Sequence, residues 1–297
     1  MKNSTFIGIA VALLAAICYG FIPYFTTPIL KNAALANPNG MSEASILFYR
    51  FGFAALLIGS FMLWRKQSFK VTRGELVTLM YLSFISDGSA LFLIESYNYM
   101  TSGVATTLHF MYPVVTALIM MTFYNEARQA STILAILMAV GGVGVLSWDP
   151  TGKMEAIGVI IAMISAVCYA LYLIRVNRSR AATMDSTKLV FYVMFIGALI
   201  FGAEALRQGS FQAIETQLQF QNLAALAIIC TVVTNVCLVI SVKRIGSTMT
   251  AVIGALEPLT AILIGCLVLN EPFTIQVFIG IALIIPAVLI IIWTRRR

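Results

Sequence analysis

Charged side chains are scarce in this sequence. Asp, Glu, Lys and Arg make up 10% of its 297 residues, whereas a typical soluble domain carries about 25%. Disordered chains, collagen-like chains and nucleic-acid-binding proteins all need more polar or charged surface than this chain has. The scarcity of charge therefore excludes these classes, and it excludes a water-soluble enzyme or receptor domain with them.

Metal-binding and disulfide patterns are missing as well. The chain has a single histidine and five cysteines, and the cysteines all lie inside apolar stretches: Cys18, Cys168, Cys230, Cys237 and Cys266. Zinc sites and disulfide frameworks need cysteines in loops or at short ligand spacings. We therefore expect the cysteines to be packing residues, and we predict a protein without a metal or a cofactor.

Apolar sequence is what the chain has in excess, with 60% hydrophobic residues and a mean hydropathy of +0.95. A membrane-spanning helix takes about 20 apolar residues, so ten spans use about 200 and leave about 97 for short loops and tails. The composition thus predicts an all-α integral membrane protein with ten transmembrane helices. The predicted spans are Phe6–Thr27, Ala44–Trp64, Glu75–Tyr97, Ser102–Phe123, Ser131–Trp148, Glu155–Val176, Lys188–Leu206, Asn222–Ser241, Ser247–Leu269 and Thr274–Trp293.

The basic residues are divided unevenly between the two sides of these ten spans. With the N-terminus on the inner side, 15 of the 19 Lys and Arg residues lie inside, three (Lys31, Lys153 and Arg207) lie outside, and Arg50 lies within a span. Lys and Arg accumulate in cytoplasmic loops. The asymmetry predicts that both termini are cytoplasmic, because one span more or fewer would reverse every later loop.

An internal repeat divides the chain into two halves. Residues 8–19 align with 158–169 at five identities in 12, and 103–126 align with 248–271, which pairs Pro113 with Pro258. The Asn-Glu pairs at 125–126 and 270–271 follow these prolines at equal distance. We expect one five-helix repeat in residues 1–150 and a second in 151–297. Because five is odd, the second copy is inverted, which is typical of alternating-access transporters with a site between the halves near the midplane.

The sequence resembles the EamA-type members of the drug/metabolite transporter superfamily over nearly its whole length. The similarity rests on the two five-span repeats, on Arg50 in span two, on the Tyr112-Pro113 and Glu257-Pro258 segments, and on the two Asn-Glu turns. The resemblance implies a ten-helix exporter of amino acids or related small metabolites, with spans 1, 3, 4, 6, 8 and 9 around a central cavity. These motifs are characteristic of the superfamily and do not indicate a substrate.

Ionisable residues within the predicted spans require an explanation, because a charged group in the membrane interior is unfavourable in free energy. Asp87, His109 and Glu257 are our candidates both for substrate binding and for proton coupling. Each also has a structural interpretation: a buried hydrogen-bonded aspartate, an interhelical histidine, and a kink carboxylate paired with Arg50. His109 precedes Pro113 by four residues, and since proline has no N–H, the carbonyl of residue 109 loses its helical partner.

Further polar residues complete the predicted substrate site. Tyr19 and Tyr169 are repeat mates, Tyr112 is the repeat mate of Glu257, and Asn235 lies in span eight. Tyrosines of this kind also occur as ordinary packing residues at helix interfaces. The remaining ionisable residues have structural interpretations. Arg50 either extends its side chain toward the outer surface or pairs with an acidic residue, and Glu95 is either a rim residue or that partner. Glu126 and Glu271 are interpreted as helix-turn caps or gate-side residues.

The glycine run Gly141-Gly142-Val143-Gly144 lies in an apolar span without the Lys and Ser/Thr of a phosphate-binding loop. Close helix packing is the better interpretation of this run.

These features together predict a secondary transporter and not an enzyme. We expect it to move, and to export, a small polar metabolite such as an amino acid across a bacterial inner membrane, with protons as a candidate coupling ion. Its partners are then the substrate and the lipid bilayer, without nucleic acid, and a homodimer stays open. The alternatives are a facilitative exchanger or uniporter for another metabolite class and a non-transporting scaffold. A channel lacks the expected rings of like residues, and a membrane enzyme lacks a surface cluster of His, Asp and Glu.

Overall fold

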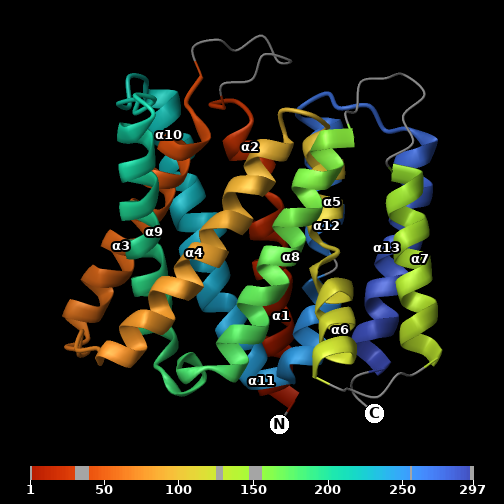
Figure 1. Cartoon of the computed structure of the whole chain (residues 1–297), viewed down its shortest axis with the longest axis horizontal. Helices are drawn as coiled ribbons and strands as arrows, with labels where there is room; N and C mark the ends of the chain where they lie inside the picture. Colours follow the sequence, from red (N-terminus) through yellow and green to blue (C-terminus); the bar gives the residue numbers. More distant parts are fainter. Residues whose placement is uncertain (1, 31–39, 125–129, 147–155, 255, 295–297) are drawn as a thin grey trace.

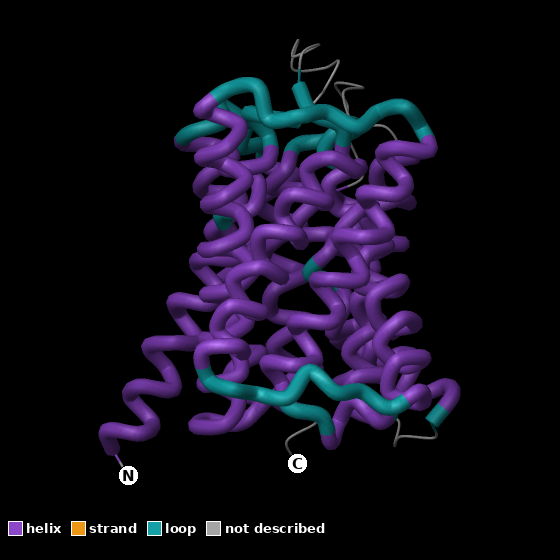
Figure 2. Tube along the Cα trace, turned by 90° about the vertical axis from the view of Figure 1, so that its left-hand side faces the viewer, coloured by secondary structure: helices purple, strands orange, loops and turns teal. Residues whose placement is uncertain are grey.

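The structure is a computed structural model that describes residues 2–30, 40–124, 130–146, 156–254 and 256–294. It is a bundle of helices that run along one common direction (Figures 1 and 2). The first half contains α1 (Lys2–Gly20), α2 (Ile22–Thr26), α3 (Glu43–Trp64), α4 (Arg73–Ser96), α5 (Ser102–His109), α6 (Tyr112–Phe123) and α7 (Ala130–Leu146). The second half contains α8 (Ala156–Arg178), the 3₁₀-helix η1 (Arg180–Thr183), α9 (Ser186–Arg207), α10 (Gln217–Ala227), the π-helix η2 (Ile228–Val233), α11 (Thr234–Gly254), α12 (Leu256–Leu267) and α13 (Ile275–Thr294).

The described helices account for the ten predicted spans. Seven apolar segments are long enough to cross a membrane, and three shorter apolar helices, within 133–145, 256–267 and 275–290, fill the remaining places. Large apolar side chains lie exposed on the outside of the bundle, as with Phe123 at 80% exposure. Such a surface suits lipid and not water, so the prediction of an all-α integral membrane protein of two five-helix repeats is confirmed.

Polar caps mark where several helices begin. The Thr72 hydroxyl accepts a hydrogen bond from the Glu75 N–H at 3.3 Å, and the Glu75 carboxylate accepts one from the Thr72 N–H at 2.6 Å. At the start of α9, the Asp185 carboxylate accepts hydrogen bonds from the N–H groups of Thr187 and Lys188. Because the first N–H groups of a helix have no partner inside it, these residues fix the ends of the long helices.

α1 begins and α13 ends at the same end of the bundle (Figure 1). We call this end the N-terminal end, and we call the opposite end, with residues 97–101 and 208–216, the distal end.

Each helix of the first half packs against a helix of the second half. The principal pairs are α1 with α11, α3 with α9, α4 with α8, α5 with α12, and α7 with α13. An exchange of the two repeats maps this set of pairs onto itself, as expected for inverted copies related by an axis between them. The two repeats are therefore interleaved, and they do not form separate bodies.

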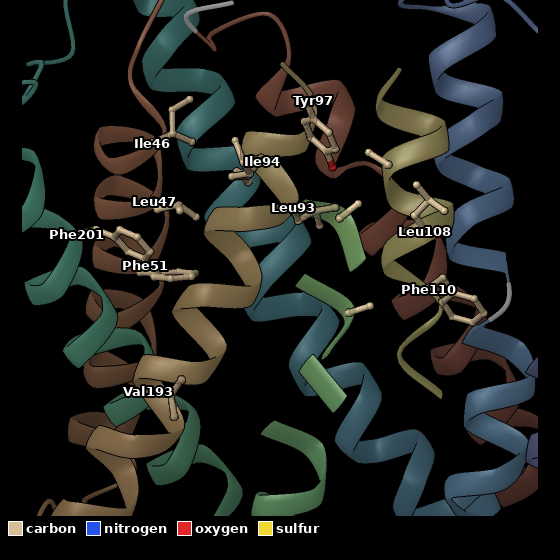
Figure 3. Packing of buried hydrophobic residues seen from close by; sticks show 14 of the residues in the cluster. Ile46, Leu47, Phe51, Leu93, Ile94, Tyr97, Leu108, Phe110, Val193 and Phe201 are labelled. Atoms are coloured by element: carbon tan, nitrogen blue, oxygen red, sulfur yellow. The ribbon is translucent and has the colours of Figure 1, made fainter. Parts of the chain in front are cut away.

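Buried apolar side chains fill the space between the paired helices. Figure 3 shows Phe51 of α3 and Phe201 of α9 facing one another, with their ring centroids 5.8 Å apart. Leu93 and Ile94 of α4 and Leu108 of α5 continue the same core toward the middle of the bundle. Burial of these side chains leaves polar groups in only a few places of the interior.

A helical break lies at Pro113. α5 ends at His109 and α6 begins at Tyr112, so the two residues between them are not helical. The break directly precedes Pro113, which cannot donate a hydrogen bond to the carbonyl four residues earlier. At the repeat-related Pro258, the residue between α11 and α12 lies outside the described part of the chain. The sequence had predicted the connection between spans eight and nine at residues 242–246, but this stretch is helical.

α7 and α13 approach closely at one glycine of the predicted glycine run. A Cβ atom on Gly142 would lie 2.6 Å from Ile284 Cγ1 and 3.1 Å from the Gly280 carbonyl oxygen, whereas one on Gly141 would meet nothing within 4 Å. The prediction of close helix packing is thus confirmed for Gly142. Gly141 faces away from α13.

This contrast gives a matched pair of variants. Gly142→Leu should destabilise the protein by about 1–3 kcal/mol through overpacking, whereas Gly141→Leu should leave the stability unchanged or slightly higher. Thermal unfolding of the two detergent-solubilised variants measures the difference, since both changes have the same helix propensity. Equal melting temperatures for the two variants would show that α7 and α13 do not pack through Gly142.

Candidate functional site

The break at Pro113 lies at the middle of the bundle. Figure 1 places α5 and α12 in the distal half and α6 in the half toward the N-terminal end. α6 therefore begins near mid-depth with Tyr112 as its first residue, and Glu257 lies near the mid-depth end of α12. A helix N-terminus carries a partial positive charge. The first turn of α6 thus gives the centre a positive electrostatic character.

An aromatic cluster lies beside the break at Pro113. It consists of His109, Tyr112, Tyr169 and Tyr172, and we call it the central cluster. The rings of Tyr112 and Tyr169 meet edge to face with centroids 4.6 Å apart. His109 lies 5.4 Å from the Tyr169 ring and 5.9 Å from the Tyr112 ring, and Tyr172 stacks on Tyr169 at 6.0 Å. These aromatic faces come from α5, α6 and α8 and therefore join both repeats.

Glu257 is a buried carboxylate next to the central cluster. Its side chain lies within electrostatic range of Tyr19, Tyr112 and Tyr169. The residue is 8% exposed, and its Oε1 atom has no hydrogen-bond partner among the described residues. α1 packs closely on the backbone of α12 at Gly20, where a Cβ atom would lie 2.5 Å from Thr260 Cβ and 2.9 Å from the backbone carbonyl oxygen of Glu257. Tyr19, the residue before this glycine, therefore lies on the helix that packs against α12.

Two serines connect His109 to the crossing of α4 and α8. His109 Nδ1 lies 2.8 Å from the hydroxyl oxygen of Ser165, and His109 is 2% exposed. The Ser165 hydroxyl donates to the Ser89 carbonyl at 2.7 Å, and the Ser89 hydroxyl donates to the Ser165 carbonyl at 3.0 Å. The imidazole is thus held from behind by a reciprocal pair of hydrogen bonds between two helices.

Asp87 lies apart from Glu257, between α4 and α9. A Cβ atom on Gly197 would lie 2.6 Å from Asp87 Oδ1 and 2.8 Å from the Phe51 ring, so the glycine makes room for the carboxyl group. Asp87 is 3% exposed, and neither of its oxygen atoms has a hydrogen-bond partner in the described part of the chain. Its link to the central cluster is Tyr172, which lies within electrostatic range.

Arg50 has a hydroxyl partner instead of the expected acid. Its Nε donates to the Thr231 hydroxyl at 3.0 Å, and its guanidinium lies 5.6 Å from the Phe51 ring centroid. Within the described part of the chain, Arg50 forms no salt bridge with Glu95 or Glu257. Thr231 belongs to the π-helix η2, whose wider turn also leaves the Thr231 carbonyl to accept from the Asn235 amide at 2.6 Å.

Glu271 closes the distal end between the repeats. Its Oε1 accepts from the Ser102 N–H at 2.8 Å and from the Ser102 hydroxyl at 2.6 Å, and its Oε2 accepts from the Gly103 N–H at 3.2 Å. The carboxylate therefore caps α5, a helix of the other repeat, in agreement with its expected capping role. Glu126, its repeat mate, lies outside the described residues.

Two cavities lie toward the ends of the bundle and not at the central cluster. The one near the distal end measures about 310 Å³ and lies between α3, α4 and α9, with Glu43 and Glu95 in its lining. The other measures about 400 Å³ and lies near the N-terminal end, beside Glu75 and Lys188. No group of three or more His, Cys, Asp or Glu side chains that could hold a metal ion occurs among the described residues.

The structure brings five of the predicted substrate-site residues together and leaves two apart. The five are Tyr19, His109, Tyr112, Tyr169 and Glu257. Asp87 lies within electrostatic range of Tyr172, and the Asn235 amide donates to the Thr231 carbonyl one turn earlier. Ser165 and Tyr172 were missed, although their spacing of −4 and +3 from Tyr169 places all three on one helix face.

Glu271 offers a stability test of the distal closure. Glu271→Gln keeps the size of the side chain but replaces one acceptor oxygen by an amide donor, so hydrogen bonds to α5 are lost. We expect a loss of about 1–3 kcal/mol, measured as a lower thermal unfolding temperature. Glu215→Gln, an exposed carboxylate near the same end, is the control and should leave the temperature unchanged. If both variants melt like the parent protein, Glu271 does not hold the repeats together.

Comparisons with known proteins agree with this architecture. A crystal structure that is 16% identical superimposes over 99% of both chains with a TM-score of 0.67, which supports the fold alone. An uncharacterized transporter of Bacillus subtilis (strain 168), YvbV, is 24% identical over 198 residues, which span 65% of this chain and 64% of that protein. That match thus covers just under two thirds of the relative's length. Residues 6–148 and 156–293 each match the EamA-like transporter family, and the chain belongs to this family of membrane transporters.

Proposed function

We propose that the protein is a secondary transporter that exports a small metabolite with an ammonium group, such as an amino acid, by alternating access. The observation that carries this proposal is Glu257, a buried carboxylate with an unpartnered oxygen atom beside tyrosine rings at the middle of the bundle. Burial of a charge without a partner is costly. A cationic substrate group supplies the missing partner.

The surroundings of Glu257 suit an ammonium group. An N–H donor of the substrate can bond to the free Oε1 atom, while the faces of Tyr112 and Tyr169 attract the cation through their π-electrons. Tyr19 from α1 adds a third tyrosine within electrostatic range of the carboxylate. Aromatic faces around a carboxylate are a common arrangement for amine recognition, and here both repeats contribute to it.

The helix break before Pro113 suits a second, anionic group on the same substrate. The first turn of α6 begins at Tyr112, in the central cluster. In transporters, the N-termini of broken helices point at anionic substrate groups. A zwitterion with an ammonium and a carboxylate uses both features, which is why an amino acid is our preferred substrate class.

The inverted repeats support alternating access. In this structure the distal end is closed by Glu271, which joins the loop after α12 to the start of α5. Release of this contact lets α5 and α12 separate at the distal end and opens a path to the central cluster. We propose residues 1–150 and 151–297 as the two repeat units, with the site in the seam between them.

The distribution of basic residues supports an orientation. Arg65, Lys70, Arg175 and Arg180 lie in or beside the connections at the N-terminal end. Cytoplasmic loops carry the excess of Lys and Arg. We therefore propose that the N-terminal end faces the cytoplasm of a bacterial cell and that the distal end faces outward across its inner membrane.

A metabolite-export screen tests the function directly. Cells that overproduce the protein should release one or a few amines or amino acids into the medium at rates above those of cells with the empty vector. Mass spectrometry of the medium identifies them. An unchanged metabolite profile across growth conditions would contradict export.

Glu257→Gln tests the role of the carboxylate in binding. This nearly isosteric change removes the charge, so the affinity for the exported amine should fall at least about tenfold, because truncating one member of a buried charge pair costs about 2–5 kcal/mol. Counterflow of the identified substrate in proteoliposomes measures the effect. Glu95→Gln, another carboxyl in the bundle, is the control and should transport normally. Full affinity in the Glu257 variant would remove Glu257 from the substrate site.

Proton coupling is the finer part of the proposal and rests on Asp87. A carboxyl group that is buried without hydrogen-bond partners is favoured as the neutral acid, so a conformation that opens it to water would let it release a proton. Asp87 packs against Gly197 of α9, and Tyr172 of the central cluster lies within its electrostatic range. Because the proton gradient across a bacterial inner membrane is directed inward, it drives export when a proton enters in exchange for the substrate, and we assign the transfer of that proton to Asp87.

Asp87→Asn separates coupled transport from facilitated exchange. The variant cannot carry a proton, so accumulation driven by a pH gradient should be lost, while substrate counterflow without a gradient should stay within about twofold. Reconstituted protein with an imposed pH gradient provides the measurement. A parent protein that ignores the gradient favours the facilitative exchanger, and a variant that still responds to it assigns coupling to another residue.

A further inference from the structure

The hydrogen bonds between Ser89 and Ser165 fix the positions of the two hydroxyl protons next to His109. The Ser165 oxygen is 2.7 Å from the Ser89 carbonyl oxygen, a distance at which a hydrogen atom must lie between two oxygens. A carbonyl has no proton to give, so this hydrogen belongs to the Ser165 hydroxyl. The Ser89 hydroxyl in turn donates to the Ser165 carbonyl. The single hydroxyl proton of Ser165 is therefore already used.

This arrangement fixes the tautomer of His109. Nδ1 lies 2.8 Å from the Ser165 oxygen, which can only accept a hydrogen bond because its proton points at Ser89. The donor must then be Nδ1 itself, which carries the ring proton. In a neutral imidazole, one nitrogen donates and the other accepts. Nε2 is consequently the nitrogen with a free lone pair.

Nothing in the described part of the chain occupies that lone pair. The hydrogen bond of His109 to a side chain is the one to Ser165, and the neighbours of its ring are the aromatic faces of Tyr112 and Tyr169. Both tyrosines belong to the proposed binding site near Glu257. The unshared nitrogen thus belongs to the same group of side chains as the carboxylate.

We propose that Ser165 is a positioning residue which holds His109 as the Nδ1–H tautomer and thereby makes Nε2 an acceptor in the central site. The role of this acceptor toward a substrate N–H group rests on the proposed function, whereas the tautomer does not. A proton added to the ring enters at Nε2 and leaves the bond to Ser165 unbroken. The charge of the site then changes without disturbing the crossing of α4 and α8.

The chain offers an unusually direct test, because His109 is its only histidine. Full-length protein labelled with ¹⁵N-histidine gives two ring-nitrogen resonances, and their couplings to Hδ2 and Hε1 distinguish Nδ1 from Nε2. At a pH where the ring is neutral, we expect a protonated Nδ1 and a bare Nε2. A protonated Nε2 with a bare Nδ1 in the parent protein would overturn the proposal.

Two serine variants make the test specific. Ser165→Ala removes the acceptor for Nδ1–H, so the Nδ1–H form should no longer dominate the spectrum. Ser89→Ala leaves the Ser89 carbonyl in place, so Ser165 keeps its donor bond and the tautomer should stay as in the parent protein. A spectrum of the Ser165 variant identical to that of the parent protein, or a tautomer change in the Ser89 variant, would contradict the positioning role.

Ser165→Thr guards against a folding defect. The threonine keeps the hydroxyl group and should retain the Nδ1–H form, which separates loss of the acceptor from general disturbance of the helix. All spectra are recorded without substrate. Failure of the export proposal therefore leaves this test unaffected, and a wrong tautomer leaves the proposed export unaffected.

Discussion

Backbone N–H and C=O groups inside a membrane have no water to bond with, so every one of them must find a partner within the protein. Pro113 and Pro258 remove one partner each at the middle of the bundle. A carbonyl that loses its helical partner in this way is tolerated only where other protein groups surround it. His109, Tyr112 and Glu257 lie within four residues of these prolines, so the location of the candidate site follows from Pro113 and Pro258.

This constraint explains why the position of the site could be predicted from the sequence, whereas the contacts between its residues could not. The offset of 145 residues paired Pro113 with Pro258 in the sequence, and a helix breaks before Pro113, between His109 and Tyr112. The inverted repeat likewise predicted that Tyr112 and Glu257 occupy equivalent positions. These features depend on local sequence, so they are readable from one chain.

Contacts between side chains of different helices could not be predicted from the sequence in the same way. An acidic residue was one expected partner of Arg50, but its guanidinium donates a hydrogen bond to Thr231. The position of Thr231 depends on a π-helix that the sequence analysis did not predict. Ser165 lay among apolar residues, and its role emerged only from the crossing of α4 with α8. Asp87 and Glu257 looked alike as intramembrane carboxylates, yet they face different neighbours. Such differences depend on tertiary packing.

The pairing of α1 with α11 has a consequence for how the protein is made. The first helix leaves the ribosome about 200 residues before its partner, and domains generally fold as their residues are synthesised. Until α11 and α12 arrive, Gly8 and Gly20 of α1 do not have the helices that they pack against. The early helices must therefore remain in the lipid as independent spans. The complete bundle forms only when the helices of the second repeat have been inserted and pack between them. Assembly is thus a late event, set by the last helices to be made.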